Sequence, residues 1–211
     1  MEHIINAVLK SNDLNYGYYG SNAFFLKRWL WWNRLKLANK LYSKHSSHIG
    51  TTTLLDFGCA FGFFSAYLSK KFKFVYLIEL NKKYLNQGVK IHDKFGNNNY
   101  LGITNSKNNP TFFINKISKK INLFLFFDVL EHIKNIDIFI AKLRKISAPN
   151  AFLLISLPTE NFLYMWLTKF KKEKDHCNRY FEIESILNKH EYDLIEKKTL
   201  FSLFNIYLYK S

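Results

Sequence analysis

The sequence contains little cysteine and no long apolar run. Only two cysteines, Cys59 and Cys177, occur among its 211 residues; we interpret Cys59 as a small apolar filler rather than half of a disulfide, and we expect a cytoplasmic protein. No stretch approaches the ~20 apolar residues of a membrane span, because the best candidate, residues 151–168, is interrupted by Pro158 and Glu160. The N-terminal residues lack the charged start and apolar centre of a signal peptide.

Acidic side chains are also scarce relative to basic ones. The chain has 16 Asp and Glu against 31 Lys and Arg, which gives a formal net charge of +15 and a pI near 9.7. Such a balance favours acidic partners, namely nucleic acid, anionic lipid head groups or phosphorylated small molecules. A genome biased toward lysine would produce the same balance, and the even spread of the lysines fits that alternative.

Alternating apolar runs and helical patterns indicate an α/β domain. The apolar runs predict strands at residues 52–56, 74–80, 121–127 and 151–157. Two strands at about 193–199 and 201–209 close the chain like a hairpin, and one more lies at either 100–104 or 111–117. We therefore predict a doubly wound, Rossmann-like, seven-stranded sheet, mostly parallel with one antiparallel strand near the C-terminus, and with helices on both faces.

The N-terminal quarter is aromatic and open to several interpretations. Residues 1–20 are polar and predict irregular chain, whereas residues 22–45 predict a long helix with Trp29, Trp31 and Trp32 crowded together. That helix packs against the domain, forms a lid over a substrate, or presents a basic and aromatic patch to a membrane surface.

A glycine-rich turn follows the first predicted strand. The strand ends at Asp56, and a tight loop then reaches Gly62, after which a helix begins. This order places a ligand over a helix N-terminus, and glycines let the backbone approach it closely. The dinucleotide fingerprint fails because Ala60 and Phe63 stand at its second and third glycine positions. The phosphate-loop motif fails because no Lys-Ser/Thr pair follows Gly62.

Acidic residues also follow two later strands. Glu79 ends the second strand, 23 residues after Asp56, where a carboxylate can accept hydrogen bonds from both ribose hydroxyls of a nucleoside; an acid at the start of a surface helix is the alternative. Residues 128–132, Asp-Val-Leu-Glu-His, follow the buried strand 121–127. A helix start rich in acids is the alternative for this segment, and the helix expected next has Ile136, Ile140 and Leu143 on one face.

A third polar segment, residues 175–181, reads Asp-His-Cys-Asn-Arg-Tyr-Phe and opens a later helix. His176 and Arg179 within it either face a substrate or serve packing and structural pairing.

Together these motifs resemble those of class I S-adenosylmethionine (SAM)-dependent methyltransferases. Residues 56–62 are similar to motif I, Asp/Glu-x-Gly-x-Gly-x-Gly, with Ala60 at the middle glycine, and residues 128–132 are similar to the Asp-x-x-Glu-His segment of the small-molecule branch. The resemblance runs from about Leu54 to the C-terminus. It is weakest over residues 95–120, where the residue that recognises adenine stays unassigned among Asn97 to Asn99, Asn105 and Asn115.

The resemblance implies a role for each part of the chain. It implies one methyltransferase domain, residues 1–211, with an N-terminal helical cover at 1–50 and a SAM-binding core at 51–211. The implied cofactor-binding residues are Asp56, Gly58, Cys59, Ala60, Gly62, Glu79, Leu80, Asp128 and Val129. Because methyl transfer from a sulfonium needs mainly positioning, a base is required only for an acceptor that is still protonated. His132 and His176 are the candidate catalytic bases.

The expected reaction is O-methylation of a small-molecule acceptor or of a glycan or lipid-linked acceptor. The aromatic segment from Phe162 to Phe170, with basic residues after it, borders the acceptor pocket, touches a lipid carrier at a membrane surface, or packs in the core.

Two alternatives use the same residues differently. Asp128, Glu131, His132 and His176 resemble the divalent-metal site of small-RNA 3′-terminal 2′-O-methyltransferases, and carboxylates with imidazoles suit Mg²⁺, Mn²⁺ or Fe²⁺. Nucleic acid would then be the acceptor, although no aromatic and basic RNA-binding module is evident. The other alternative is an inactive interaction protein with a SAM fold, against which the retained Asp56, Gly58, Gly62 and Glu79 argue.

Overall fold

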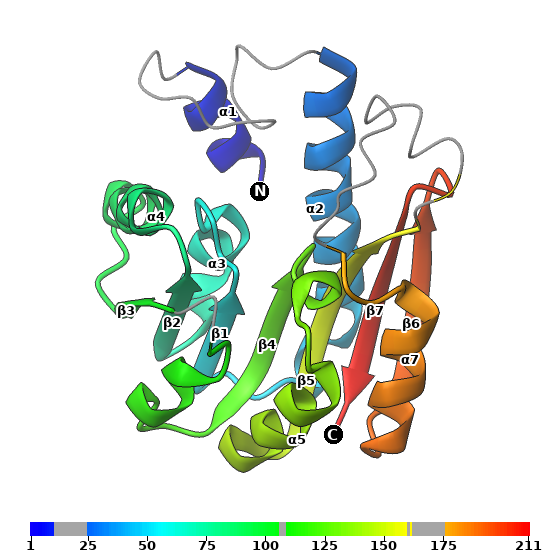
Figure 1. The fold of residues 1–211 in the computed structure, drawn as a ribbon. Helices are drawn as coiled ribbons and strands as arrows, with labels where there is room; N and C mark the ends of the chain where they lie inside the picture. Colours follow the sequence, from blue (N-terminus) through cyan, green and yellow to red (C-terminus); the bar gives the residue numbers. More distant parts are fainter. Residues whose placement is uncertain (11–24, 106–108, 160, 162–175) are drawn as a thin grey trace.

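The computed structural model describes residues 1–10, 25–105, 109–159, 161 and 176–211, and these form a single seven-stranded sheet flanked by helices (Figure 1). The strands are β1 (Thr53–Phe57), β2 (Phe74–Glu79), β3 (Tyr100–Thr104), β4 (Ile121–Phe127), β5 (Ser147–Pro158), β6 (Asp193–Leu200) and β7 (Phe204–Lys210). The α-helices are α1 (Glu2–Lys10), α2 (Phe25–His45), α3 (Phe63–Leu68), α4 (Lys82–Lys94), α5 (Ile136–Ile146) and α7 (Tyr180–Lys189). Short 3₁₀ turns are η2 (Ser46–His48), η3 (Ser69–Lys71), η4 (Phe112–Lys116) and η5 (Leu130–His132).

The order of the strands confirms the predicted fold. The sheet runs β3-β2-β1-β4-β5-β7-β6. Strands β1 to β5 pair in parallel, whereas β7 pairs antiparallel with both β5 and β6. The single antiparallel strand is therefore β7. The order reverses on either side of β1 and β4, which makes their carboxyl ends the expected ligand-binding edge.

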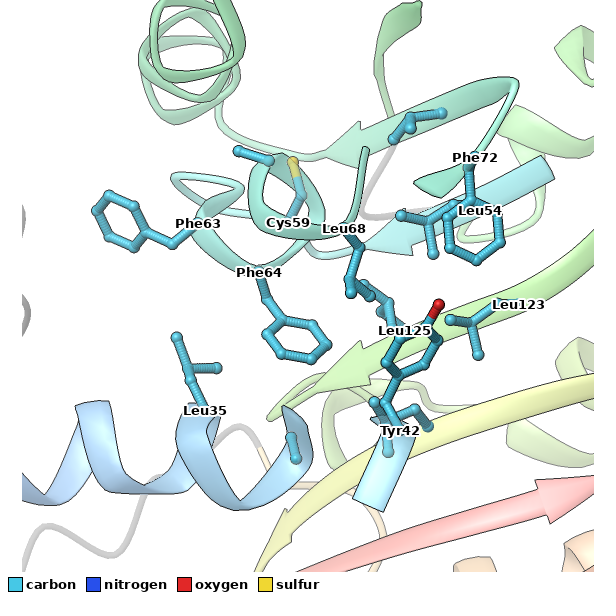
Figure 2. Close-up of a cluster of buried hydrophobic side chains, with 14 of the residues drawn as sticks. Leu35, Tyr42, Leu54, Cys59, Phe63, Phe64, Leu68, Phe72, Leu123 and Leu125 are labelled. Atoms are coloured by element: carbon cyan, nitrogen blue, oxygen red, sulfur yellow. The ribbon is translucent and has the colours of Figure 1, made fainter. Parts of the chain in front are cut away.

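Alternate residues of every central strand enter two separate cores. On β1, Leu54 belongs to one core and Leu55 to the other, and the same alternation occurs along β2, β4, β5 and β7. Helices α2, α3 and α4 cover the first face, whereas α5, α7 and η4 cover the second. Figure 2 shows the first core, where Leu35 and Tyr42 of α2 meet Phe64 of α3. Both faces are buried, which explains the unbroken apolar runs of the central strands.

Helix α2 packs against the sheet along much of its length. It contacts β5, β6 and β7, and it buries Leu30, Trp32, Arg34, Leu35, Ala38, Leu41 and Tyr42. At its C-terminal end, Lys44 Nζ and His45 Nε2 lie 2.7 and 2.8 Å from the Glu196 carboxylate on β6. The structure thus supports packing against the sheet as the interpretation of this helix. The division of the domain into an N-terminal cover, residues 1–50, and a SAM-binding core, residues 51–211, stays a prediction.

The structure corrects one local expectation and decides between the alternatives at two other places. Residues 2–10 form a helix rather than irregular chain, because Ile4 is fully buried in the first core; residues 11–20 lie outside the described part. The third strand is residues 100–104, since 112–116 form a 3₁₀ turn instead. Residues 128–132 do not begin a helix, because Asp128 has a positive φ and only a 3₁₀ turn follows it.

Candidate functional site

The loop after β1 is a tight turn fastened to the end of β2. The backbone N–H groups of Gly58 and Cys59 both donate to the Ile78 carbonyl, at 2.8 and 3.0 Å, and Gly62 N–H donates to the Cys59 carbonyl at 2.7 Å. Gly58, Ala60 and Gly62 all have positive φ, between 46° and 70°. Ala60 therefore keeps a left-handed conformation that glycine adopts more easily, which makes the loop strained at the residue that departs from motif I.

Asp56 supports this loop from below rather than facing the open edge. Its side chain is buried beneath α3, where it forms a hydrogen bond with Ser65. Burial raises the pKa of Asp56 to about 7, against the opposing effect of the Ser65 hydrogen bond. The neighbouring Cys59 thiol is also buried and free, and burial raises its pKa.

Glu79 ties together the ends of β1 and β2. Its Oε2 accepts a hydrogen bond from Ala60 N–H at 2.8 Å, and its Oε1 accepts from Leu80 and Asn81 N–H at 2.8 and 2.9 Å. The carboxylate thus lies at the point where the glycine loop and the second strand end meet. Its remaining lone pairs can accept from the hydroxyl groups of a ligand at this edge.

Asp128 is held by residues from two other elements. It has φ 54°, and its N–H donates to the Ser156 carbonyl at 3.0 Å. Ser156 Oγ donates to Asp128 Oδ1 at 3.3 Å, and the carboxylate forms an ion pair with the buried Arg34 of α2. The Arg34 guanidinium lies 5.3–5.9 Å from the ring centres of Trp31, Phe127 and Phe204. Sequence reasoning missed Arg34, because it lies 94 residues from its partner and belongs to no motif.

A second polar group forms where the residue 176–180 segment docks on η5. The N–H groups of Cys177 and Asn178 donate to the Glu131 carbonyl at 2.6 and 3.2 Å, and the Asn178 side chain donates to the Ile133 carbonyl at 2.7 Å. This docking places the rings of His132 and His176 edge to face, with centres 4.7 Å apart.

Arg179 takes a structural position at the start of α7. Its N–H donates to the Glu182 carboxylate at 2.6 Å, and its guanidinium lies 6.0 Å from the Phe181 ring centre. It does not line the cavity described next.

A cavity of about 900 Å³ opens at the carboxyl ends of β1, β2 and β4. Six of the predicted residues line it: Gly58, Glu79, Leu80, Asp128, Val129 and His132. The other predicted residues are not part of its wall: Asp56, Cys59, Ala60, Gly62 and His176. The structure therefore separates the predicted site into residues that face the cavity and residues that shape the loop behind it.

Asn105 is the wall residue that the sequence did not single out from its neighbours. It follows β3, its N–H donates to the Glu79 carbonyl at 2.8 Å, and its Nδ2 donates to the Pro110 carbonyl at 3.1 Å. Its Oδ1 is buried and has no hydrogen-bond partner among the described residues. An unsatisfied buried acceptor is costly, so this oxygen suits a ligand donor such as the exocyclic amino group of adenine.

Comparisons with known proteins agree with the fold. A family model described as a methyltransferase domain matches residues 27–197. The N-methyltransferase NodS from Bradyrhizobium japonicum WM9 superposes with a TM-score of 0.68 at 14% identity, over 86% of this chain and 96% of that one. Magnesium protoporphyrin IX methyltransferase (ChlM) from Synechocystis PCC 6803, with bound S-adenosylhomocysteine (SAH), superposes with a TM-score of 0.67 at 13% identity, over 99% and 93% of the two chains.

A SAM-dependent methyltransferase from Aquifex aeolicus is also similar, with a TM-score of 0.59 and 17% identity over 83% of this chain and 97% of that one. No curated protein matches the sequence. The match of the family model spans most of the chain, and the fold agrees with the motifs. The chain therefore belongs to the methyltransferase domain family, and it is a SAM-dependent methyltransferase of class I.

Proposed function

We propose that SAM lies in the cavity at the carboxyl ends of β1, β2 and β4, and that the protein transfers its methyl group to an oxygen atom of an acceptor. The observation that carries the proposal is the convergence of Gly58, Glu79, Asp128 and Val129 on one cavity, from three separate strand ends. A cavity of about 900 Å³ is large enough for a cofactor of this size. SAM supplies the methyl group on a sulfonium, from which a neutral thioether leaves.

Each side chain of the wall has a proposed role in holding the cofactor. The Glu79 carboxylate accepts from the ribose hydroxyls, and the unsatisfied Oδ1 of Asn105 accepts from the adenine amino group. Gly58 lets the backbone approach the cofactor closely. A side chain at this position would also collide with Val129, 2.8 Å away. Asp56 and the rest of the glycine loop keep this arrangement in place.

His132 is the proposed base. It lines the cavity, and the edge-to-face contact with His176 fixes its ring. A neutral imidazole nitrogen can remove the proton from an acceptor hydroxyl as the new bond forms, which contributes about 10²–10⁴ in rate when such a base is well placed. A base at this position suits an acceptor that is still protonated, such as a hydroxyl group.

The acceptor is proposed to be a small molecule or a glycan or lipid-linked group, because such a group fits a concave cavity better than an extended nucleic-acid strand does. The aromatic segment from Phe162 to Phe170, expected to border the acceptor or a membrane surface, lies outside the described residues. No helix within the described residues is long and apolar enough to cross a bilayer.

Equilibrium dialysis with SAM labelled on its methyl group tests the first half of the proposal. Glu79→Gln should weaken binding about tenfold or more, because the negative charge is lost and glutamine has one acceptor oxygen where Glu79 uses two. Glu196→Gln on β6 is the matched control and should bind like the intact protein. Equal binding by both variants would remove Glu79 from the cofactor site.

The acceptor is tested with a metabolite and lipid extract incubated with the labelled cofactor. Mass spectrometry should find the label as a methyl ether or ester that is absent when His132→Ala replaces the intact protein, although this variant still binds SAM. A label found only on nitrogen would overturn O-methylation and leave cofactor binding intact.

A second candidate is a divalent-metal-dependent RNA 2′-O-methyltransferase. One observation favours it: single ligand atoms of Glu131, His132 and His176 lie within 4.8 Å of one another. Asp128 is not in this group, and its carboxylate is paired with Arg34. Three of the four predicted ligands thus come together, and a carboxylate with two imidazoles suits Mn²⁺ or Fe²⁺.

Metal titration separates the two functions. If Glu131, His132 and His176 hold a metal, Mn²⁺ should bind at one site per chain and restore the activity lost on chelation, and Glu131→Gln should abolish both effects. Activity that is unchanged after complete chelation would contradict the metal-dependent candidate.

A further inference from the structure

A chain of buried polar side chains lies directly beneath the glycine loop. Asp56 comes from β1, Ser65 from α3 and His92 from α4, and Ser65 and His92 are both completely buried. None of the three lines the cavity. Buried polar groups are costly unless they are hydrogen-bonded, so their position under the loop calls for a physical reason.

Ser65 is the centre of this chain. Its hydroxyl lies 3.1 Å from the Gly62 carbonyl and 3.4 Å from His92 Nε2, and it also forms the hydrogen bond with the Asp56 carboxyl. One hydroxyl therefore contacts the last residue of the glycine loop, the acid of the first strand and the imidazole of α4.

The positions of the protons follow from the partners. Ser65 has one hydrogen, which it gives to one acceptor at a time: the Gly62 carbonyl, or the Asp56 carboxylate when that group is ionised. In either case no hydrogen is left for His92 Nε2, which must carry its own hydrogen and donate to Ser65. Burial lowers the pKa of His92 to about 4, so the ring is neutral and carries only that hydrogen. Its Nδ1 has no partner among the described residues, as expected for a nitrogen without a hydrogen in this tautomer.

Helix α4 also touches the loop at a second place, one turn earlier. A side-chain carbon at Gly88 would lie 3.3 Å from the Ala60 carbonyl oxygen, so the helix backbone packs on the loop backbone. Gly88 and His92 are four residues apart and share one face of α4. At Gly62 an added carbon would meet Ser65 Oγ at 3.3 Å and His92 Nε2 at 3.5 Å. The loop is thus supported along its length by α3 and α4.

We propose that Ser65 and His92 are positioning residues of the cofactor loop, which act through Asp56 and the Gly62 carbonyl to hold residues 58–62 in the shape that binds SAM. The inference rests on the proposed position of SAM. It assigns to α4 a part in cofactor affinity, although no residue of this helix lines the cavity.

The test compares SAM dissociation constants, measured by calorimetry, across a small set of variants. Ser65→Ala and His92→Leu should each raise the dissociation constant about tenfold, in keeping with the loss of a buried hydrogen bond. His92→Gln should stay within about threefold of the intact protein, because the glutamine amide can donate from the place of Nε2. Ser69→Ala is the matched control: Ser69 is equally buried, but its hydroxyl donates to the Ala66 carbonyl and not to the loop.

A second measurement separates positioning from a general loss of structure. Ser65 favours the charged form of Asp56, whose other neighbours are Glu79, the Cys59 thiol and, through Ser65, His92. SAM should bind best when Asp56 is ionised, so Ser65→Ala should move the pH profile of SAM binding to higher pH. A general loss of structure around the loop would instead lower the affinity for SAM equally at every pH.

The outcomes are distinct. Unchanged affinity in Ser65→Ala and His92→Leu, with binding lost in Glu79→Gln, would overturn the positioning role and leave the proposed function standing. Absence of SAM binding by the intact protein would overturn the proposed function itself. A Ser69→Ala defect as large as that of Ser65→Ala would also overturn the positioning role.

Discussion

Four residues at the edge proposed for the cofactor have left-handed backbone conformations. Gly58, Ala60, Gly62 and Asp128 all have positive φ, and two of them are not glycine. Such residues persist only where the surrounding structure fixes them, and they concentrate at functional sites. Here the hydrogen bonds from Ala60 to Glu79 and from Asp128 to Ser156 supply that constraint.

Gly58 and Gly96 offer a matched comparison at this scale. Both have φ 70°, but an added carbon at Gly58 would lie 2.8 Å from Val129 Cγ2, whereas at Gly96 it would meet nothing within 4 Å. We expect Gly96→Ala to cost about 1–2 kcal/mol in unfolding free energy, which is the left-handed penalty alone. Gly58→Ala should cost more and also weaken SAM binding. Urea unfolding and dialysis measure the two effects, and equal effects of the two substitutions would contradict the steric reason.

Asp56 and His92 predict opposite dependences of stability on pH. Burial raises the pKa of Asp56 to about 7 and lowers that of His92 to about 4. Between about pH 4.5 and 6.5 the unfolded chain holds a proton on the histidine that the folded protein lacks, so this residue makes stability rise with pH. The folded protein keeps a proton on Asp56 that the unfolded chain has released, so this residue makes stability fall with pH.

In the intact protein the two slopes should largely cancel. His92→Gln should therefore leave an unfolding free energy that falls as pH rises through this window, by at most about 1.4 kcal/mol per pH unit. Asp56→Asn should leave the opposite slope. Urea unfolding at several pH values provides the measurement, and parallel curves for all three proteins would show that these groups titrate normally.

Sequence reasoning identified the residues that a motif contains and missed those that support it. Glu79 was predicted from its place at a strand end, and the cavity includes it. Ser65, His92 and Arg34 carry no local signal, because each acts through a partner that only the folded chain brings near. Asn105 was one of several asparagines, and only its buried, unsatisfied oxygen distinguishes it.

At the scale of elements, α2 is connected to the cofactor edge by one ion pair. Arg34 is almost completely buried, whereas the Asp128 side chain keeps 25% of its surface exposed. The Asp128 carboxylate therefore receives both the cation of α2 and the hydroxyl of Ser156 on β5. The orientation of the residues after β4 depends on a helix that lies far away in the sequence.

Arg34→Met tests this connection. Removal of one member of a buried pair costs about 3–5 kcal/mol, and partial exposure of Asp128 should reduce that to ~2 kcal/mol. SAM affinity should fall as well, since Asp128 loses its support. Lys36→Met, on the exposed face of α2, is the control and should change neither quantity. A double variant with Asp128→Asn should recover part of the lost stability; additive losses in the double variant would argue against a direct coupling.

Elements with a strong apolar pattern were predicted well, and those governed by backbone strain were not. The run at 121–127 is β4 with the same bounds. By contrast, the alternative of a helix start at residues 128–132 does not hold, because Asp128 turns the chain with φ 54°. The helix expected next, with Ile136 on its apolar face, is α5. Acidic residues after a strand do not distinguish a helix start from a left-handed turn.

For the whole molecule, the fold follows from the sequence more completely than the acceptor does. Seven apolar segments in the right order are enough to predict a doubly wound sheet. The acceptor depends on residues around the far side of the cavity, and residues 11–24 and 162–175 lie outside the described part. The net charge of +15 does not select among anionic acceptors.

Cofactor binding should stabilise the whole domain, since the residues proposed to hold the cofactor come from several strands of one sheet. SAH at one hundred times its dissociation constant should add about 2.7 kcal/mol. For a domain of this size that corresponds to a rise in Tm of about 5–10 °C. Calorimetry of the intact protein and of Glu196→Gln should show the full shift, and Glu79→Gln should show a much smaller one at the same SAH concentration. A shift that is the same in all three would mean that SAH binds elsewhere.

The docking of α2 also has a consequence for the order of events during synthesis. The ribosome makes this helix early, yet Lys44 finds Glu196 152 residues later, and the β7 strand that α2 covers ends at Lys210. The apolar side of α2 therefore lacks its partners β6 and β7 while residues 46–192 are made, and it is exposed during that time to chaperones or to misfolding.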